Sequence, residues 1–191
     1  GNVSFYNQSS DDGPVFPTPT IGMIGLIENP ENQMTLDFKN EGDLIYLVGQ
    51  VQNDIASSEY LYSYRGIKAS PAPAFDLEEE FGLQQAVGQL IAKNLVRSVH
   101  DISDGGLFVA LAESALPCGL GFEVATMDDY RKDAFLFGES QSRVVVSVSP
   151  DKQAEFQKVL GGELKTAHAL LGKVTSDDFV VDQQTVILTS E

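Results

Sequence analysis

The chain has 191 residues, of which 42% are hydrophobic and 21% charged, the composition of an ordinary globular domain. Its 28 acidic residues against 12 Lys and Arg give a net charge of −16, which argues against binding nucleic acid or an anionic membrane surface. The single cysteine cannot form an internal disulfide, and no apolar run approaches the roughly 20 residues that span a bilayer. These features predict a cytoplasmic protein that contacts neither nucleic acid nor membrane.

Residues 1–34 differ in pattern from the rest of the chain. A strand that enters a turn is predicted over Gly1–Tyr6, and the prolines of residues 17–20 predict a stiff extended stretch. Residues 21–27 are predicted to form a buried strand, with glycines that allow another backbone to approach. Two such strands bury little by themselves. We therefore expect residues 1–34 to be the remnant of a preceding domain, and residues 35–191 to be an α+β domain that is truncated at its end.

From residue 35 onward, the sequence patterns predict alternating strands and helices. Apolar residues at helical spacing predict a helix over residues 76–94, with Asp76 as its N-cap. Further helices are predicted from the residue after Gly106 to about Leu116, from Thr126 as a cap to Phe135, and from Ser149 as a cap before Pro150. Strands are predicted over residues 43–51, 96–100, 121–124, 143–149, 170–175, 179–181 and 185–188. The fold class expected is α+β, a mixed sheet with helices packed on one side of it.

Polar chemistry is concentrated in one loop, residues 138–143, at the entrance to the most strongly predicted strand. The sequence Gly-Glu-Ser-Gln-Ser-Arg places a flexible glycine, hydroxyls, an amide, a carboxylate and a guanidinium within six residues. Such a loop can turn backbone N–H groups and hydroxyls toward one oxyanion. The alternative is a tight turn with a surface ion pair between Arg143 and Glu139. The loop by itself gives the two interpretations equal weight.

A second polar segment, residues 100–107, closes a predicted strand and opens a helix. Asp101, Ser103 and Asp104 are candidate caps of this helix, and the glycines at 105 and 106 permit close approach of a backbone or a ligand. The carboxylates would repel a phosphate, so capping and packing are favoured over anion binding. His100 and His168 lack metal-ligand spacing, and no Gly-x-Ser-x-Gly elbow is present. No catalytic residue is assigned.

The first four residues are a third candidate. A glycine permits close approach of a phosphate, an asparagine carbonyl is an acceptable ligand for Mg²⁺, and a serine hydroxyl can donate to phosphate. Gly1, Asn2 and Ser4 supply these groups. The alternative is a simple strand terminus, and the residues alone do not favour the site.

Taken together, three sets of segments resemble one family. They are Gly1–Asn7 with residues 17–23, His100–Leu107 with residues 110–113, and Phe137–Val144. In order, spacing and context they are similar to the synthetase subunits of small, multi-subunit phosphoribosylformylglycinamidine synthases, within the aminoimidazole ribonucleotide synthetase superfamily. The resemblance implies an ATP-dependent carbon–nitrogen ligase of purine biosynthesis. Such an enzyme converts formylglycinamide ribonucleotide, ATP and glutamine-derived ammonia to formylglycinamidine ribonucleotide, ADP and phosphate through a phosphorylated amide.

The resemblance also implies cofactors, site residues and partners. The cofactors are ATP and Mg²⁺, and by motif position Gly1 contacts ATP, Asn2 binds Mg²⁺ and Ser4 contacts the substrate. The partners are a glutaminase subunit, a small accessory subunit and the ribonucleotide substrate. The catalytic histidine and main nucleotide-binding residues belong to domains that this chain lacks, so the chain alone is expected to be inactive. Its exposed edges also make a homodimer an expectation.

In this family the synthetase consists of two duplicated halves, and the present chain resembles the second. The Glu-Ser-Gln segment of the first half would bind substrate, so its copy here is an auxiliary site that is vestigial or structural. The residues implied for this auxiliary phosphate site are Gly138, Glu139, Ser140, Gln141 and Arg143.

Two alternatives remain open at the level of sequence. The chain could be another superfamily member, such as a selenophosphate or thiamine-phosphate synthetase or a hydrogenase-maturation protein, although these lack the first set of segments. It could also be a non-catalytic interaction domain that docks a basic partner through its acidic face.

Overall fold

The computed structural model describes residues 21–187, and the chain divides into two units at Pro30 and Glu31. The strand predicted over Gly1–Tyr6 and the extended stretch at 17–20 lie outside the described residues. Residues 21–27 form no strand, and their apolar side chains are exposed, Met23 to 92% and Leu26 to 89%. A strand needs a neighbour for its backbone hydrogen bonds, and no described strand pairs with this segment. The buried strand predicted there is therefore wrong.

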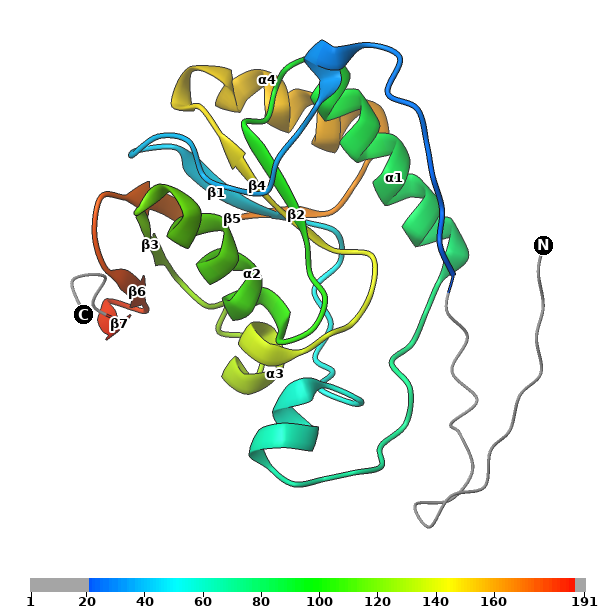
Figure 1. The fold of residues 1–191 in the computed structure, drawn as a ribbon, viewed down its shortest axis with the longest axis vertical. Helices are drawn as coiled ribbons and strands as arrows, with labels where there is room; N and C mark the ends of the chain where they lie inside the picture. Colours follow the sequence, from blue (N-terminus) through cyan, green and yellow to red (C-terminus); the bar gives the residue numbers. More distant parts are fainter. Residues whose placement is uncertain (1–20, 188–191) are drawn as a thin grey trace. The chain divides into compact units, whose positions relative to one another are not determined.

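A seven-stranded mixed sheet forms the centre of the second unit, in the order β2-β4-β1-β5-β3-β6-β7 (Figure 1). Neighbouring strands are antiparallel except β3 and β6, which are parallel. Every strand predicted after residue 35 is present, and the α+β class with a mixed sheet is confirmed. The strands are β1 Leu44–Val48, β2 Ser98–Asp101, β3 Gly121–Val124, β4 Val144–Val148, β5 His168–Thr175, β6 Phe179–Val181 and β7 Gln184–Ile187.

Four α-helices accompany the sheet in the described residues. They are α1 Leu77–Ala92, α2 Gly106–Ala115, α3 Lys132–Phe137 and α4 Gln153–Lys158. Shorter 3-10 or π turns lie at Pro30–Asn32, Tyr60–Tyr64, Leu116–Cys118, Pro150–Lys152 and Val159–Leu164. The first helix begins as predicted, because the Asp76 carboxylate accepts hydrogen bonds from the N–H groups of Glu78 and Glu79. Between residues 21 and 187, no helix is long and apolar enough to cross a membrane.

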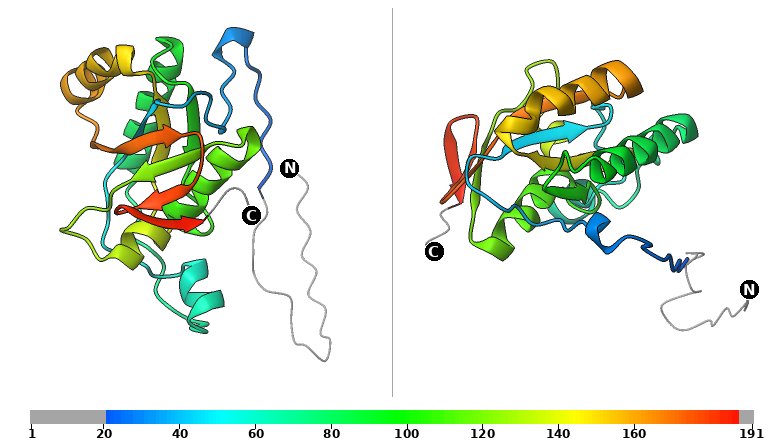
Figure 2. Two further views of the ribbon diagram at one scale, coloured as in Figure 1. Left: turned by 90° about the vertical axis from the view of Figure 1, so that its left-hand side faces the viewer. Right: turned by 90° about the horizontal axis from the view of Figure 1, so that it is seen from above.

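Helices cover both faces of the sheet, so the prediction that they pack on one side is wrong (Figure 2). Ile45 and Leu47 of β1 belong to a core cluster shared with α2 and α3. Tyr46 and Val48 belong to the cluster shared with α1 and α4. Successive side chains of a strand point to opposite faces, which places the two clusters on opposite sides of the sheet. Helical periodicity shows which side of a helix is buried, but not which face of the sheet it covers.

The third helix begins five residues later than predicted, with Arg131 rather than Thr126 at its N-cap position, because Thr126 has another partner. The backbone N–H and the hydroxyl of Thr126 each donate to the Asp182 carboxylate at 2.8 Å. Thr126 therefore ties the end of β3 to the turn between β6 and β7, and α3 begins at Lys132.

Ser149 stands at the predicted N-cap position but does not cap. Its hydroxyl donates to Asp151, the 3-10 turn Pro150–Lys152 follows, and α4 begins at Gln153. The short side chain finds an acceptor within its own turn, which leaves the helix N–H groups to other partners.

Candidate functional site

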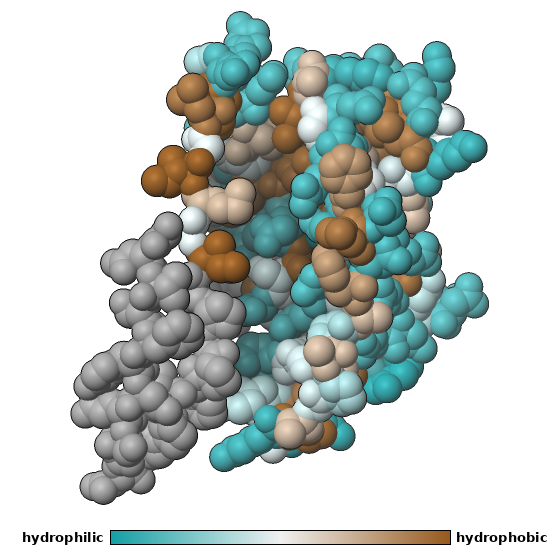
Figure 3. Space-filling view, turned by 90° about the vertical axis from the view of Figure 1, so that its right-hand side faces the viewer, coloured by the Kyte–Doolittle hydropathy of each residue, from teal (hydrophilic) through white to brown (hydrophobic). Residues whose placement is uncertain are grey.

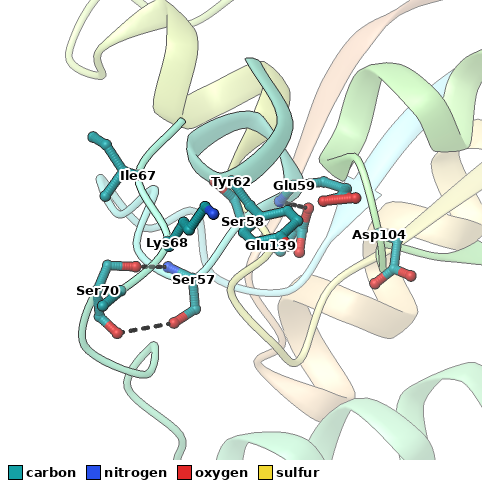
Figure 4. Close-up of a pocket in the computed structure, with 10 residues that line it drawn as sticks. Ser57, Ser58, Glu59, Tyr62, Ile67, Lys68, Ser70, Asp104 and Glu139 are labelled. Atoms are coloured by element: carbon teal, nitrogen blue, oxygen red, sulfur yellow. Dashed lines mark hydrogen bonds between the residues drawn. The ribbon is translucent and has the colours of Figure 1, made fainter. Parts of the chain in front are cut away.

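The loop of residues 138–143 joins α3 to β4 and lies against the N-terminus of α2. Oxygen Oε1 of Glu139 accepts two backbone hydrogen bonds. One comes from the N–H of Gly105 at 2.8 Å, and the other comes from the N–H of Glu59 at 2.7 Å (Figure 4). Gly105 occupies the N-cap position of α2, with a φ of 86° and no side chain to offer. A carboxylate is favourable at this end of a helix, where the macrodipole is positive. Glu139 therefore joins three segments that are far apart in the sequence.

The caps predicted for α2 are wrong. Oδ1 of Asp101 lies 3.4 Å from Nδ1 of His100, and the backbone carbonyl of Ser103 accepts from the N–H of Gly106. Asp104 lines a cavity that is described below. Among the described residues, no side chain of Asp101, Ser103 or Asp104 bonds to the start of the helix. The N–H of its N-cap residue, Gly105, donates to Glu139 instead.

Two glycines allow the loop and the helix to meet. Gly106 has a φ of +73°, and a Cβ there would lie 2.7 Å from the carbonyl carbon of Phe137. A Cβ on Gly138 would lie 2.3 Å from the carbonyl oxygen of Asp54 and 2.4 Å from that of Ala134. The close approach predicted at Gly105-Gly106 is present, and it is an approach of two backbones.

Arg143 closes the loop from inside. Its side chain is buried, with 3% of the residue exposed; Nε donates to the carbonyl of Ser140 at 3.0 Å, and Nη2 donates to the carbonyl of Gly138 at 2.8 Å. Burial lowers the pKa of Arg143 to about 10, so the guanidinium remains charged at neutral pH. The surface ion pair with Glu139 that the sequence allowed is therefore wrong. Nη1 of Arg143 and Oγ of Ser140 are buried and have no hydrogen-bond partner among residues 21–187.

The two remaining loop residues differ in their surroundings. Gln141 is exposed, whereas Ser142 is half-buried and its Oγ donates to Oε2 of Glu80 at 2.8 Å, which links the loop to the first turn of α1. The auxiliary site predicted from sequence is thus divided. The guanidinium of Arg143 donates hydrogen bonds to the backbone carbonyls of Gly138 and Ser140, whereas the side chain of Glu139 accepts one from the start of α2.

Residues 53–71 form a segment beside the loop, which we call the wall. Residues that precede Gly138 in the sequence contact this wall. The ring of Tyr60 stacks on that of Phe137, with centroids 5.3 Å apart and an interplanar angle of 11°. Oδ1 of Asn53 accepts from the N–H of Arg131 at 3.1 Å. Hydrogen bonds of Ser57 to residues 70 and 71 close the wall on itself.

This wall, the loop and the start of α2 enclose a cavity of about 390 Å³ (Figure 4). Its charged lining residues are Glu59, Lys68, Asp104 and Glu139, and Lys68 forms no ion pair with any residue in the part of the chain that is described. Three carboxylates against one ammonium make the cavity acidic at neutral pH. It is suited to a small polar molecule, and a phosphate would meet electrostatic repulsion there. Sequence reasoning missed this cavity because residues 53–71 carry no periodic pattern.

The two histidines do not line this cavity. Gly1, Asn2 and Ser4 lie outside the described residues. His100 pairs through Nε2 with Glu113 at 2.9 Å, and Nδ1 of His168 lies 2.9 Å from the carbonyl of Thr166. Within residues 21–187 no group of three or more His, Cys, Asp or Glu is placed to hold a metal ion.

Comparison with known proteins identifies related sequences. Residues 40–183 match the family described as "AIR synthase related protein, C-terminal domain". The phosphoribosylformylglycinamidine synthase subunit PurL of Moorella thermoacetica is 47% identical over 151 residues, 79% of this chain and 20% of that protein. The PurL subunit of Caldanaerobacter subterraneus subsp. tengcongensis is 41% identical over 182 residues, 95% of this chain and 25% of that protein. The chain therefore spans a fifth to a quarter of the length of these relatives.

Solved structures share the fold. One described as T. maritima PurL complexed with FGAR has a TM-score of 0.70 at 20% identity, over 83% of this chain and 29% of that one. T. maritima PurL complexed with ATP gives 0.64 at 19% identity, over 83% and 26% of the two chains. The structure of PurLQS from Thermotoga maritima gives 0.63 at 18% identity, over 83% and 27%. At these identities the likeness shows the fold alone, and it confirms the mixed sheet with packed helices.

Proposed function

The chain belongs to the family of AIR synthase related proteins, and on that premise we propose that it is part of a PurL-type synthetase subunit. The reaction proposed is the ATP-dependent conversion of formylglycinamide ribonucleotide and ammonia to formylglycinamidine ribonucleotide. The observation that carries the proposal is the 41–47% identity to PurL subunits over most of the chain. Structures of T. maritima PurL with FGAR and with ATP support the ligands proposed for that subunit.

We place the first residues at the reacting centre of the intact enzyme. Gly1 would lie against ATP, Asn2 would offer its side-chain carbonyl to Mg²⁺, and Ser4 would donate its hydroxyl to the substrate. The donor set fits, because a neutral amide oxygen is an ordinary ligand of Mg²⁺ and a serine hydroxyl donates well to phosphate. When bound, Mg²⁺ would neutralise phosphate charge, and ATP would supply the phosphoryl group that makes the amide oxygen a leaving group.

Substitutions in the full-length subunit test these roles separately. Asn2→Ala should raise the Mg²⁺ concentration needed for half-maximal activity, whereas Ser4→Ala should mainly raise the KM for the ribonucleotide. Gln8→Ala, a polar neighbour without an assigned role, is the matched control. Equal effects of all three substitutions on both parameters would contradict the assignment.

The auxiliary phosphate site at residues 138–141 and Arg143 remains a proposal of the same family resemblance. The buried, unpartnered atoms Nη1 of Arg143 and Oγ of Ser140 support a polar ligand at this loop. The acidic cavity beside the loop favours a structural role for the loop instead. Titration of sulfate or ADP·Mg²⁺ into the protein decides between them, since a silent titration at millimolar ligand leaves the loop structural.

We further propose the boundaries and the partners of the chain. A remnant of an ATP- and Mg²⁺-binding domain over residues 1–34 and a C-terminal domain over residues 35–191 are supported by the family match, which begins at residue 40. A glutaminase subunit and a small accessory subunit are supported by the PurLQS assembly of Thermotoga maritima. Without the other domains the chain is expected to be inactive.

One feature of the chain favours self-association, and another opposes it. Apolar side chains are exposed on the side of the molecule where α1 lies, including Leu77 at 69% and Phe81 at 58% (Figure 3). This surface supports a homodimer, whereas the net charge of −16 opposes it by mutual repulsion. We also propose a cytoplasmic location, which the proposed pathway supports. The same net charge supports the proposal that neither nucleic acid nor membrane is a partner.

A further inference from the structure

Two backbone N–H groups from distant segments converge on one oxygen. The N–H of Gly105 and the N–H of Glu59 both donate to Oε1 of Glu139, at 2.8 and 2.7 Å. The first belongs to the N-cap residue of the ten-residue helix α2, and the second precedes the π turn Tyr60–Tyr64. Converging N–H donors at a helix N-terminus are the arrangement with which proteins bind external oxyanions. Here the oxygen that they hold belongs to the chain itself.

The carboxylate is delivered to this position by a fixed backbone. Gly138, directly before Glu139, lies between the carbonyls of Asp54 and Ala134 with no room for a Cβ. The ring of Phe137 stacks on Tyr60, and the buried guanidinium of Arg143 ties the following turn. These contacts hold the backbone on both sides of residue 139, so that only the side-chain rotamer of Glu139 remains to be ordered when the hydrogen bonds form.

The carboxylates around Glu139 disfavour an additional, external anion next to its own carboxylate. Glu59 and Asp104 already line the adjoining cavity together with Glu139. A phosphate beside them would meet three carboxylates. If the Glu139 carboxylate were removed, the two N–H donors would lose their acceptor and the cavity would gain space next to them.

We propose that Glu139 is the resident anion of this site: its carboxylate occupies the oxyanion position between Gly105 and Glu59, fastens the wall of residues 53–71 to α2, and keeps external anions out. The loop is thus an anion cradle filled by its own side chain. This inference goes beyond the proposed reaction and does not depend on it.

Chemical rescue tests the proposal directly. Glu139→Ala should lower the melting temperature and speed amide hydrogen exchange at Gly105 and Glu59 by about tenfold or more, the change that the loss of roughly 1.4 kcal/mol produces. Formate or acetate should then raise the melting temperature saturably and restore protection at both amides. Chloride at equal ionic strength should not. Glu139→Gln, which keeps an acceptor oxygen, should lose less protection and show weaker rescue.

Matched controls separate rescue from general salt effects. Glu155→Ala removes one exposed carboxylate from α4, and neither it nor the wild type should show formate-specific stabilisation. If Glu139→Ala fails to fold in plain buffer, refolding with formate but not with chloride supports the proposal. Equal refolding in both salts, or unchanged exchange at Gly105 and Glu59, overturns it.

The result is separable from the auxiliary phosphate proposal. Sulfate bound by Arg143 and Ser140 would be detected with the wild type and would leave the amides of Gly105 and Glu59 unchanged. Sulfate that protects these two amides in Glu139→Ala, but not in the wild type, supports the resident carboxylate whatever the fate of the auxiliary site.

Discussion

At the scale of single residues, the meeting of loop and helix depends on glycines that no side chain can replace. Gly106 combines a φ of +73° with backbone atoms of Phe137 and Gly138 within 2.8 Å of a would-be Cβ. Gly88, inside α1, is also a glycine, but nothing lies within 4 Å of its would-be Cβ. The two positions therefore respond oppositely to the same substitution.

Gly106→Ala should destabilise the protein by at least about 2 kcal/mol, because the left-handed backbone is strained for alanine and the methyl group meets backbone that cannot give way. Gly88→Ala should stabilise it by about 0.5–1 kcal/mol through helix propensity. Urea denaturation measures both. A neutral Gly106→Ala would show that the close approach of the loop is absent in solution.

The sequence predicted roles that depend on near neighbours in the chain, but not roles that depend on distant ones. Asp76 caps α1 as predicted, because a capping side chain bonds to N–H groups two or three residues away. Glu139 acts on Gly105 from 34 residues away, and only the fold creates that proximity. The only signal in the sequence was the pair of glycines at the start of α2, and the three polar residues before them pointed to local caps instead.

At the scale of elements, the sheet was predictable and the wall of residues 53–71 was not. Strands such as β4, with four valines, show their burial in composition alone. The wall is held by single contacts such as the stacking of Tyr60 on Phe137, which leave no periodic pattern. The same applies to Thr126, whose bond to Asp182 decides where α3 begins.

Asp182 fastens the turn between β6 and β7 to the end of β3, and its effect on stability should depend on pH. The hydrogen bond from Lys132, followed by that from the N–H of Thr126, lowers the pKa of Asp182 below its ordinary value of 3.8. A lowered pKa in the folded state contributes stability above the ordinary value, which is lost as the pH falls through the lowered one.

Asp182→Asn should therefore lower the free energy of unfolding by about 1 kcal/mol at neutral pH. The effect is no larger because the Lys132 side chain is exposed and solvent screens its ion pair with Asp182. The difference from the wild type should shrink at pH values below about 4. Asp177→Asn, in the neighbouring exposed turn, is the control. A loss of stability that stays the same from neutral to acid pH would contradict the ionic role of Asp182.

At the scale of the whole molecule, the chain is the C-terminal type of AIR synthase related domain with a conspicuous acidic charge. Its described sheet, the two faces that helices cover and the α2-to-loop junction lie within residues 31–187. Its proposed contribution to chemistry lies instead in the first four residues, outside the described part. We therefore propose that the domain supplies scaffold and shape, and that the reaction would take place only within a longer PurL-type subunit.

A chimera tests this central claim most directly. The segment of the Caldanaerobacter subterraneus PurL subunit that is 41% identical to this chain is replaced by the chain itself, and ammonia-dependent formation of formylglycinamidine ribonucleotide is measured. We predict a chimera within about tenfold of the parental rate, equivalent to about 1.4 kcal/mol of barrier, and no turnover by the chain alone. A folded chimera without activity, or turnover of ATP and ribonucleotide by the isolated chain, would contradict the account.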